Sequence, residues 1–249
     1  MKEFRFSATG ASLFATESGA EGSTPVIFIH GGLANQQSVR LWASGIPARL
    51  ITPDLRGSGR SHDPGPLSWD QLADDVAALA AHLGLARAIV GGISFGSGVA
   101  VATALRHPEL VAKLAIVHPA YGGAELGLLP AQQAAMAAMD ALGSRTVTEG
   151  ISALFPLIER MPPALHERAR AVFATYDPAS VAASTRFMAS GAQPFARGED
   201  LAAIAAPAVL IPGVDPTHPP EVAAVYRTHL RACTVRETPD FAAAIGELL

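Results

Sequence analysis

The sequence is poor in the residues that several functional classes require. Its single cysteine, Cys233, excludes a disulfide within the chain and a thiolate cluster for zinc. The 18 basic and 22 acidic residues give a net charge of −4, which provides no field that attracts nucleic acid or an anionic membrane. No run reaches about 18 apolar residues, and the N-terminus, MKEFRFSATGASLF, lacks the apolar core of a signal peptide. We therefore expect a soluble, cytoplasmic protein with a small-molecule substrate and neither nucleic-acid nor membrane partners, and nothing specifies an oligomeric state.

Apolar runs and helical patterns alternate along the first half of the chain and again near its end. Strands are predicted at residues 3–7, 11–16, 25–29, 49–53, 86–90, 110–117, 208–212 and 233–238. Helices are predicted at 68–83, 95–107, 220–230 and 239–249. This order predicts an α/β fold with a mostly parallel central sheet that is flanked by helices on both faces.

The alternation stops after His118. Residues 119–205 show only helical segments, at 130–142, 148–155, 163–176 and 180–190, separated by glycine and proline. We therefore predict a core of residues 1–118 and 206–249 and a helical insertion of residues 119–205. The insertion could cap the carboxyl edge of the sheet, where open α/β sheets bind ligands. The alternative is a helical flank that only stabilises the fold.

Ser94 is the strongest candidate for a nucleophile. The segment Gly92-Ile93-Ser94-Phe95-Gly96 fits G-x-S-x-G, directly after a predicted strand and directly before a predicted helix. A sharp turn there forces Ser94 into a strained backbone conformation. Glycines at 92 and 96 have no side chain, so the backbone segments on the two sides of the turn can approach each other without collision. The hydroxyl then lies at a helix N-terminus, which favours developing negative charge. The alternative is a glycine turn needed only for packing.

Five segments together resemble the α/β-hydrolase fold superfamily, and its esterases and lactonases in particular. They are HGG at 30–32, DLRGSGRS at 54–61, GGISFGSG at 91–98, RHPELVAKLAIV at 106–117 and GVDPTHP at 213–219. The resemblance implies that the backbone N–H groups of Gly32 and Phe95 form an oxyanion hole and that Asp215 is the acid of a catalytic triad. It implies no cofactor and no metal. Gly31 and Leu33, in the same glycine loop, are candidate substrate contacts, and His30 is expected to orient that loop.

The sequence departs from this family at the catalytic histidine. The family places it after the last strand, where this chain has Thr238, Pro239, Asp240 and Phe241, and no histidine follows His229. Either another residue has taken over the chemistry, or the serine is not activated in the usual manner.

His218 is the best remaining candidate for the base. Pro216 favours a tight turn that brings Asp215 and His218 together, so that the carboxylate orients the imidazole. The second ring nitrogen must then lie about 3 Å from the Ser94 hydroxyl. The alternative is a turn at a helix entry in which His218 caps or packs. His118, at the end of a strand, is a further candidate, as a substrate contact or as a hydrogen-bond partner of residues 119–121.

Two classes of function follow from these residues. The first is a serine hydrolase that cleaves a small ester, thioester or lactone through Ser94. The second is a protein of the same fold without triad hydrolysis, namely a cofactor-free lyase, cyclase or isomerase, or a binding protein. Because a fold does not by itself determine function, the geometry of the site has to separate them.

Overall fold

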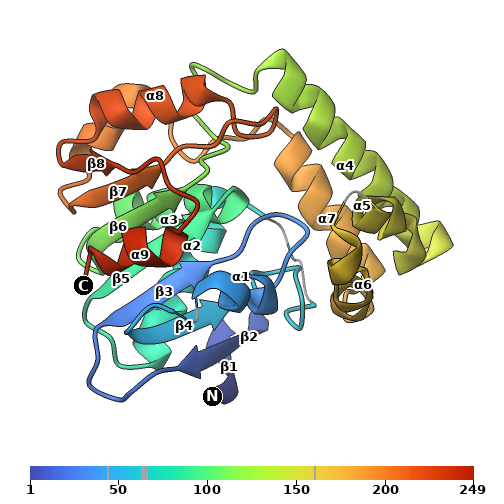
Figure 1. Cartoon of the computed structure of the whole chain (residues 1–249), viewed down its shortest axis with the longest axis horizontal. Coiled ribbons are helices and arrows are strands. Elements are labelled where there is room, and N and C mark those ends of the chain that lie inside the picture. Colours follow the sequence, from blue (N-terminus) through green and yellow to red (C-terminus); the bar gives the residue numbers. More distant parts are fainter. Residues whose placement is uncertain (44, 63–64, 66, 160) are drawn as a thin grey trace.

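The centre of the molecule is an eight-stranded sheet with the order β1-β2-β4-β3-β5-β6-β7-β8 (Figure 1). The computed structural model describes residues 1–43, 45–62, 65, 67–159 and 161–249. The strands are β1 (Lys2–Ala8), β2 (Ala11–Ser18), β3 (Pro25–Ile29), β4 (Arg49–Pro53), β5 (Ala88–Ile93), β6 (Val111–Val117), β7 (Ala208–Ile211) and β8 (Cys233–Val235). β2 is antiparallel to β1 and to β4, and the pairs from β4 to β8 are parallel. The predicted mostly parallel sheet is confirmed.

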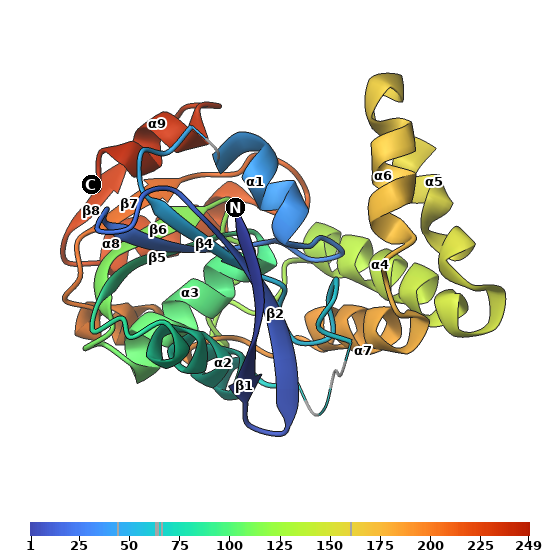
Figure 2. The ribbon, with the colours of Figure 1, turned by 90° about the horizontal axis from the view of Figure 1, so that it is seen from below.

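Helices cover both faces of this sheet (Figure 2). One face carries α1 (Gln36–Ala43) and α9 (Phe241–Gly246), and the other carries α2 (Trp69–His82), α3 (Phe95–Arg106) and α8 (Pro220–His229). Successive residues of a strand point to opposite faces. In β3, Val26 and Phe28 belong to the core under α1 and α9, whereas Ile27 and Ile29 belong to the core under the other three helices. Burial on both faces explains why the strands are almost continuously apolar.

The parallel strands bring the candidate residues to one edge of the sheet. β3 ends directly before His30, β5 ends directly before Ser94, and β6 ends directly before His118. β7 ends shortly before the loop that holds Asp215. Because parallel strands all end at the same edge, the loops that follow them lie side by side there.

The helices of the predicted insertion lie together beyond that edge of the sheet (Figures 1 and 2). They are α4 (Pro130–Glu149), α5 (Phe155–Glu159), α6 (His166–Phe173) and α7 (Pro178–Ala189), with short 3-10 turns η1 (Ile151–Leu154) and η2 (Pro163–Leu165). They enclose a small core of their own, formed by Leu154, Ile158, Phe173, Tyr176 and Val181. A last turn, η3 (Gly198–Ala203), packs back against α8. Among the described residues of 119–205, none lies in a strand.

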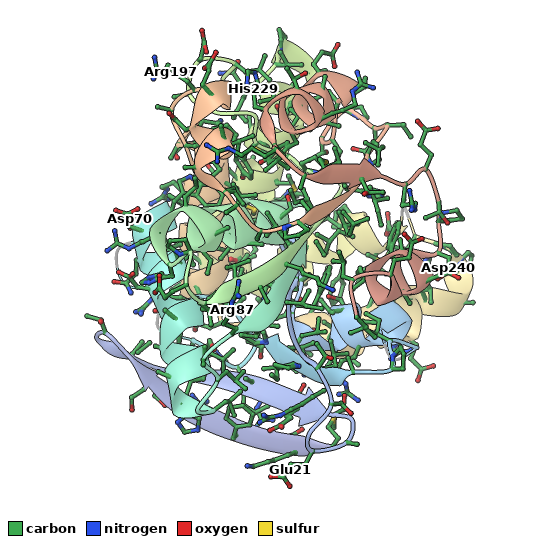
Figure 3. The ribbon with its side chains drawn as sticks, turned by 90° about the vertical axis from the view of Figure 1, so that its left-hand side faces the viewer. Glu21, Asp70, Arg87, Arg197, His229 and Asp240 are labelled. Atoms are coloured by element: carbon green, nitrogen blue, oxygen red, sulfur yellow. The ribbon has the colours of Figure 1, made fainter. Side chains whose placement is uncertain are left out.

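Charged side chains lie mostly at the outside of the fold. Figure 3 labels Glu21, Asp70, Arg87, Arg197, His229 and Asp240, all of which are exposed except the half-buried His229. A buried exception is Arg56, whose guanidinium forms two hydrogen bonds of 2.9 and 2.7 Å with the Asp75 carboxylate and so ties the loop after β4 to α2. In the parts of the chain that the structure describes, we find no helix with the length and apolarity needed for a membrane span.

Candidate active site

Ser94 stands on a sharp turn between β5 and α3. Its φ of 56° and ψ of −119° are values that residues other than glycine rarely adopt. Positions 92 and 96, two residues away on either side, must be glycine, because a Cβ atom at Gly92 would collide with the carbonyl oxygen of Gly96, and one at Gly96 with the carbonyl oxygen of His30. The Ser94 N–H donates to the Val117 carbonyl at 2.9 Å, which fastens the turn to β6. The strained turn predicted from the glycine pattern is confirmed.

The hydroxyl of Ser94 contacts His218 in the loop that follows β7. Ser94 Oγ lies 2.8 Å from His218 Nε2, and His218 Nδ1 lies 2.8 Å from Asp215 Oδ2. With the ring neutral, Nδ1–H donates to the carboxylate and Nε2 is free to accept the serine proton. The His218 side chain is 14% exposed and that of Asp215 is 50% exposed. The structure thus brings together the three residues predicted as a triad. Ser94 and His218 are 124 positions apart in the sequence.

The loop from Asp215 to His218 is the tight turn expected at Pro216. The His218 N–H donates to the Asp215 carbonyl at 3.0 Å, and the Thr217 N–H donates to Asp215 Oδ1 at 2.8 Å. Burial opposes ionisation of Asp215, but hydrogen bonds from the His218 ring and from these N–H groups outweigh it and hold the pKa of Asp215 below its usual value. Asp215 is therefore an ionised partner for the imidazole at neutral pH.

Gln132, in the first turn of α4, ties the insertion to this loop. Its side chain is fully buried, and its amide nitrogen donates to the carbonyls of Ala120 and Thr217, the latter at 3.0 Å. Its amide oxygen accepts the Leu129 N–H at 3.3 Å. Sequence reasoning missed this residue, because only the folded chain shows that position 132 lies beside the residue preceding His218.

The glycine loop after β3 lies against the serine turn, as an oxyanion hole requires. A Cβ atom at Gly31 would lie 3.9 Å from Ser94 Oγ, and one at Gly32 would lie 4.0 Å from the Phe95 Cβ. Phe95 is the first residue of α3, where a backbone N–H has no acceptor within the helix. The end of the Met188 side chain, in α7, lies against Gly32: a Cβ atom there would be 2.3 Å from the Met188 sulfur, so the methionine would have to shift. Leu33, next in the loop, has a φ of 52° and its carbonyl accepts a hydrogen bond of 3.2 Å from the Tyr176 hydroxyl.

His30 holds two of these loops together. Its Nε2 accepts the Leu55 N–H at 3.0 Å, so Nδ1 carries the proton and donates to the Gly31 carbonyl at 2.7 Å. Complete burial lowers the pKa of His30 to about 4, although the bond to Gly31 acts in the opposite direction. His30 is therefore a neutral group that links the loops after β3 and β4, in line with the orienting role expected for it.

His118 packs between the triad and the C-terminal helix. Its ring lies 5.7 Å from the His218 ring and 5.0 Å, edge to face, from the Phe241 ring. Burial, and then the charge of His218, lowers the pKa of His118. Phe241 belongs to the segment after the last strand where the hydrolase resemblance places a histidine. An aromatic ring from that segment thus packs against His118, which in turn lies beside His218.

The remaining histidines have contacts elsewhere. The His82 ring stacks on Phe4 at 5.5 Å, and His107 Nε2 lies 2.7 Å from Asp74 Oδ1. His166 Nε2 bonds the Met161 carbonyl at 2.8 Å, the His62 carbonyl accepts from Ser180, and His229 lies against Gly198. Within the described ranges no group of three or more His, Cys, Asp or Glu residues is placed to hold a metal ion.

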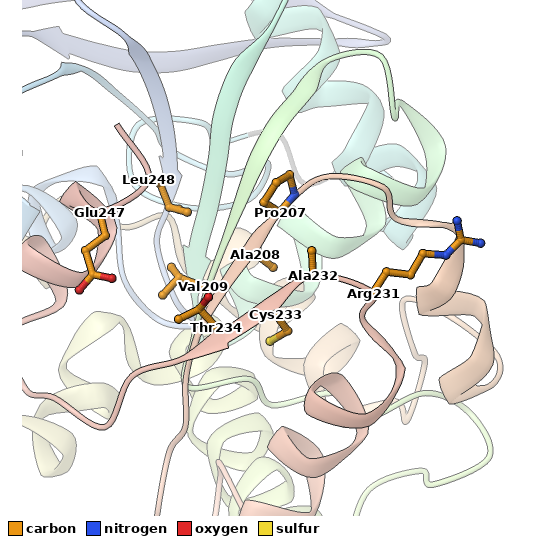
Figure 4. A pocket seen from close by; sticks show the side chains of 9 residues that line it. All are labelled: Pro207, Ala208, Val209, Arg231, Ala232, Cys233, Thr234, Glu247 and Leu248. Atoms are coloured by element: carbon orange, nitrogen blue, oxygen red, sulfur yellow. The ribbon is translucent and has the colours of Figure 1, made fainter.

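An open hollow of about 420 Å³ lies at the opposite edge of the sheet (Figure 4). It is lined by Pro207, Ala208, Val209, Arg231, Ala232, Cys233, Thr234, Glu247 and Leu248. These residues surround the starts of β7 and β8, whereas Ser94 and His218 follow strand ends. The hollow is therefore remote from the serine and takes no part in the arrangement described above.

Comparison with known protein families agrees with this geometry. A family model described as the alpha/beta hydrolase fold matches residues 24–171, which is more than half of the chain and includes the Ser94 turn. The chain belongs to the alpha/beta hydrolase family. The matched range ends before Asp215 and His218, so membership does not by itself assign the base.

Curated relatives of this chain match over part of their length. The sn-1-specific diacylglycerol lipase ABHD11 of Danio rerio is 31% identical over 103 residues, which are 40% of this chain and 32% of the lipase. The proline iminopeptidase of Neisseria gonorrhoeae is 34% identical over 110 residues, which are 42% of this chain and 35% of that enzyme. The matches thus span about a third of the length of these relatives.

Solved structures match the chain over almost its whole length. A thermophilic esterase from Thermogutta terrifontis has a TM-score of 0.72 at 24% identity, over 94% of this chain and 89% of the esterase. An enol-lactonase from Burkholderia xenovorans has a TM-score of 0.71 at 22% identity, over 98% and 97% of the two chains. At such identities the similarity establishes the fold, which confirms the α/β-hydrolase prediction.

Proposed function

We propose that this alpha/beta hydrolase is a serine hydrolase that cleaves a small ester, thioester or lactone. The observation that carries the proposal is the continuous contact from Asp215 through His218 to Ser94, with 2.8 Å at each step. In the proposed reaction His218 Nε2 takes the Ser94 proton while Oγ bonds to the acyl carbon. The N–H groups of Gly32 and Phe95 stabilise the oxyanion, and each such donor is worth roughly 3 kcal/mol in a transition state.

The second half of the reaction releases the acyl group. His218 returns the proton to the alcohol or thiol as its bond to the acyl carbon breaks, which leaves an acyl-Ser94 ester. Water then attacks this ester, His218 takes the water proton, and Ser94 regains its hydroxyl as the acid leaves. Asp215 stays ionised throughout and stabilises the imidazolium that forms twice in each cycle.

The contacts of the insertion support a cap over the proposed site. Met188 of α7 lies against Gly32, the Tyr176 hydroxyl binds the Leu33 carbonyl, and Gln132 of α4 binds the Thr217 carbonyl. Each contact joins the insertion to a loop that holds a proposed catalytic group. A helical flank that only stabilised the fold would not need to meet these loops. We propose the cap role on this basis, and the cytoplasmic location and small-molecule substrate stay predictions.

The missing histidine after the last strand leaves open a non-hydrolytic descendant of the fold. Such a protein would not need an imidazole held against the serine for acyl transfer. His218 occupies that position from a different loop, so the geometry favours the hydrolase. The relatives include a lipase and an iminopeptidase by name, which supports acyl transfer as the reaction class.

A fluorophosphonate probe tests the proposal directly. The probe should label the wild-type chain, and labelling should disappear in Ser94→Ala, because only an activated serine reacts. Turnover of p-nitrophenyl hexanoate should fall by about four orders of magnitude or more in His218→Ala. If the wild-type chain is not labelled at any pH between 6 and 9, or if His218→Ala loses less than about tenfold, the proposed triad is wrong.

A further inference from the structure

Beside Ser94, four aromatic side chains meet at the junction between the core and the insertion. We call Trp69, Phe95, Tyr121 and Phe187 the aromatic cluster. The Trp69 ring lies 5.2 Å from that of Phe95, 4.8 Å from that of Tyr121 and 5.4 Å from that of Phe187. Phe95 directly follows Ser94, and Phe187 directly precedes Met188, the residue that lies against Gly32. The cluster therefore adjoins the proposed oxyanion hole.

Two polar atoms in this cluster have no hydrogen-bond partner among the described residues. They are Trp69 Nε1 and the Tyr121 hydroxyl, and both are buried. Buried polar groups without a partner are rare in folded proteins, and each one costs stability. Two of them on rings in contact, next to a proposed nucleophile, therefore require an explanation.

Packing against α3 fixes the direction of these rings. A Cβ atom at Gly98 would lie 2.8 Å from the Cη2 and Cζ3 atoms of Trp69 and 3.2 Å from Cδ2 of Tyr121. The six-membered ring of the indole thus packs against α3 at Gly98. The Nε1 atom, on the five-membered ring, therefore points away from Gly98. The Tyr121 backbone is held as well, because its carbonyl accepts a hydrogen bond of 2.7 Å from the Tyr226 hydroxyl.

We propose that Trp69 Nε1–H and the Tyr121 hydroxyl form a subsite for a neutral oxygen acceptor on the substrate, such as a ketone or ether oxygen close to the scissile ester. The indole N–H only donates, and the phenol hydroxyl can donate to the same oxygen. The cluster contains no charged side chain, so a carboxylate would be buried there without a counter-charge, which is unfavourable. Phe187, on α7 of the insertion, packs against the rings of Trp69 and Phe95 and would have to move to admit this part of the substrate. The inference rests on the proposed hydrolase function.

The test compares matched esters that differ in one oxygen. On the acyl side, p-nitrophenyl 4-oxohexanoate and 5-oxohexanoate are compared with p-nitrophenyl hexanoate. On the alcohol side, 2-methoxyethyl hexanoate is compared with butyl hexanoate. The wild-type chain should prefer the oxygen-bearing ester of at least one pair by about tenfold in kcat/KM, the size expected of one well-placed hydrogen bond. A p-nitrophenyl monoester of adipic acid, which carries a carboxylate, should gain nothing.

Tyr121→Phe removes only the unpartnered hydroxyl. It should abolish most of the preference and leave thermal stability unchanged or raised, because no internal hydrogen bond is lost. Trp69→Phe should weaken the same preference. Tyr226→Phe is the matched comparison for stability: it removes a buried hydroxyl that donates to a carbonyl, so it should lower the thermal midpoint, which Tyr121→Phe should not.

The outcomes separate this inference from the proposed function. If hexanoate is cleaved and Ser94 is labelled, but no oxygen-bearing ester is preferred or Tyr121→Phe leaves the preference intact, the subsite is wrong and the hydrolase stands. A buried water that satisfied both groups would show itself as a loss of stability in Tyr121→Phe with an unchanged preference, which also overturns the subsite. If no ester is cleaved and no serine is labelled, both proposals fail.

Discussion

A Cβ atom at Gly213 would collide with the Cβ atom of His218, so the loop after β7 can place His218 only if position 213 has no side chain. Gly213→Ala should therefore push the imidazole away from Ser94. We expect ester turnover to fall by about 100-fold, since a displacement of about 1 Å at a catalytic group has an effect of that size. The measurement is kcat for p-nitrophenyl hexanoate together with the thermal midpoint. Gly246→Ala, where nothing lies within 4 Å of the added Cβ, is the control: it should leave kcat unchanged and should not lower the thermal midpoint, because alanine is favoured over glycine in a helix.

Gln132→Met should lower kcat more than it changes KM. The substitution keeps the length of the side chain but removes both donors, so the Thr217 carbonyl loses its partner and the neighbouring His218 is less firmly held. We expect a loss of about tenfold in kcat. Because Gln132 is a positioning residue, the pH profile of kcat should change together with the rate. An unchanged profile with only a lower thermal midpoint would show that Gln132 merely joins α4 to the core.

The sequence was sufficient for most of the fold because its signals were local. The strand at 25–29, the strand at 49–53 and the glycines around Ser94 were each read from short patterns, and the structure has them where predicted. Helix α4 instead continues to Glu149, beyond the predicted end at residue 142, because its pairing with α7 outweighs the weak helix preference of Gly143. Strand β8 ends at Val235, three residues early, since it pairs only with the short β7.

The site was harder to predict because it depends on contacts between distant parts of the chain. The turn at Pro216 explains why Asp215 and His218 are neighbours. Whether His218 reaches Ser94 depends on where β7 and β5 end relative to each other, because those strand ends position the two loops. No sequence pattern indicates the roles of Gln132 and of the aromatic cluster. A glutamine in a helix and aromatic residues scattered along the chain occur in most proteins. His118 was singled out by its place at a strand end, but its packing on Phe241 joins segments that only the fold brings together.

The buried His30 should make stability depend on pH in a predictable direction. Burial lowers the pKa of its ring from 6.5 to about 4, so the unfolded chain takes up a proton before the native chain does. The contribution of His30 to the free energy of unfolding is therefore fully present above pH 6.5 and is lost as the pH falls to about 4, and its change is about 3 kcal/mol. Urea unfolding at pH 4.5, 5.5 and 7 should show the difference between wild type and His30→Gln shrinking as the pH falls.

Asp54 should make stability depend on pH in the opposite direction to His30, so the two residues form a matched comparison. Burial raises the pKa of its carboxyl from 3.8 to about 6, against the hydrogen bonds from the Arg60 and Gln36 N–H groups. The native chain therefore holds the proton more firmly than the unfolded chain, and this contribution to stability is lost as the pH rises from 3.8 through about 6. The difference in unfolding free energy between wild type and Asp54→Asn should fall across that range. If both variants showed the same pH trend, one of the two pKa shifts would be assigned with the wrong sign.

The two histidines near Ser94 should respond differently to loss of the imidazole. The contacts of His118 are ring packing on His218 and Phe241, so His118→Phe should preserve them and keep ester turnover within about fivefold of wild type. His218→Phe removes the nitrogen that lies 2.8 Å from Ser94 Oγ and should reduce turnover by about four orders of magnitude. Fluorophosphonate labelling rates of both variants check this, because labelling requires a base but no substrate pocket. A large loss in His118→Phe with labelling intact would make His118 a substrate contact, whereas equal losses in both variants would mean that the proton leaves Ser94 by another route.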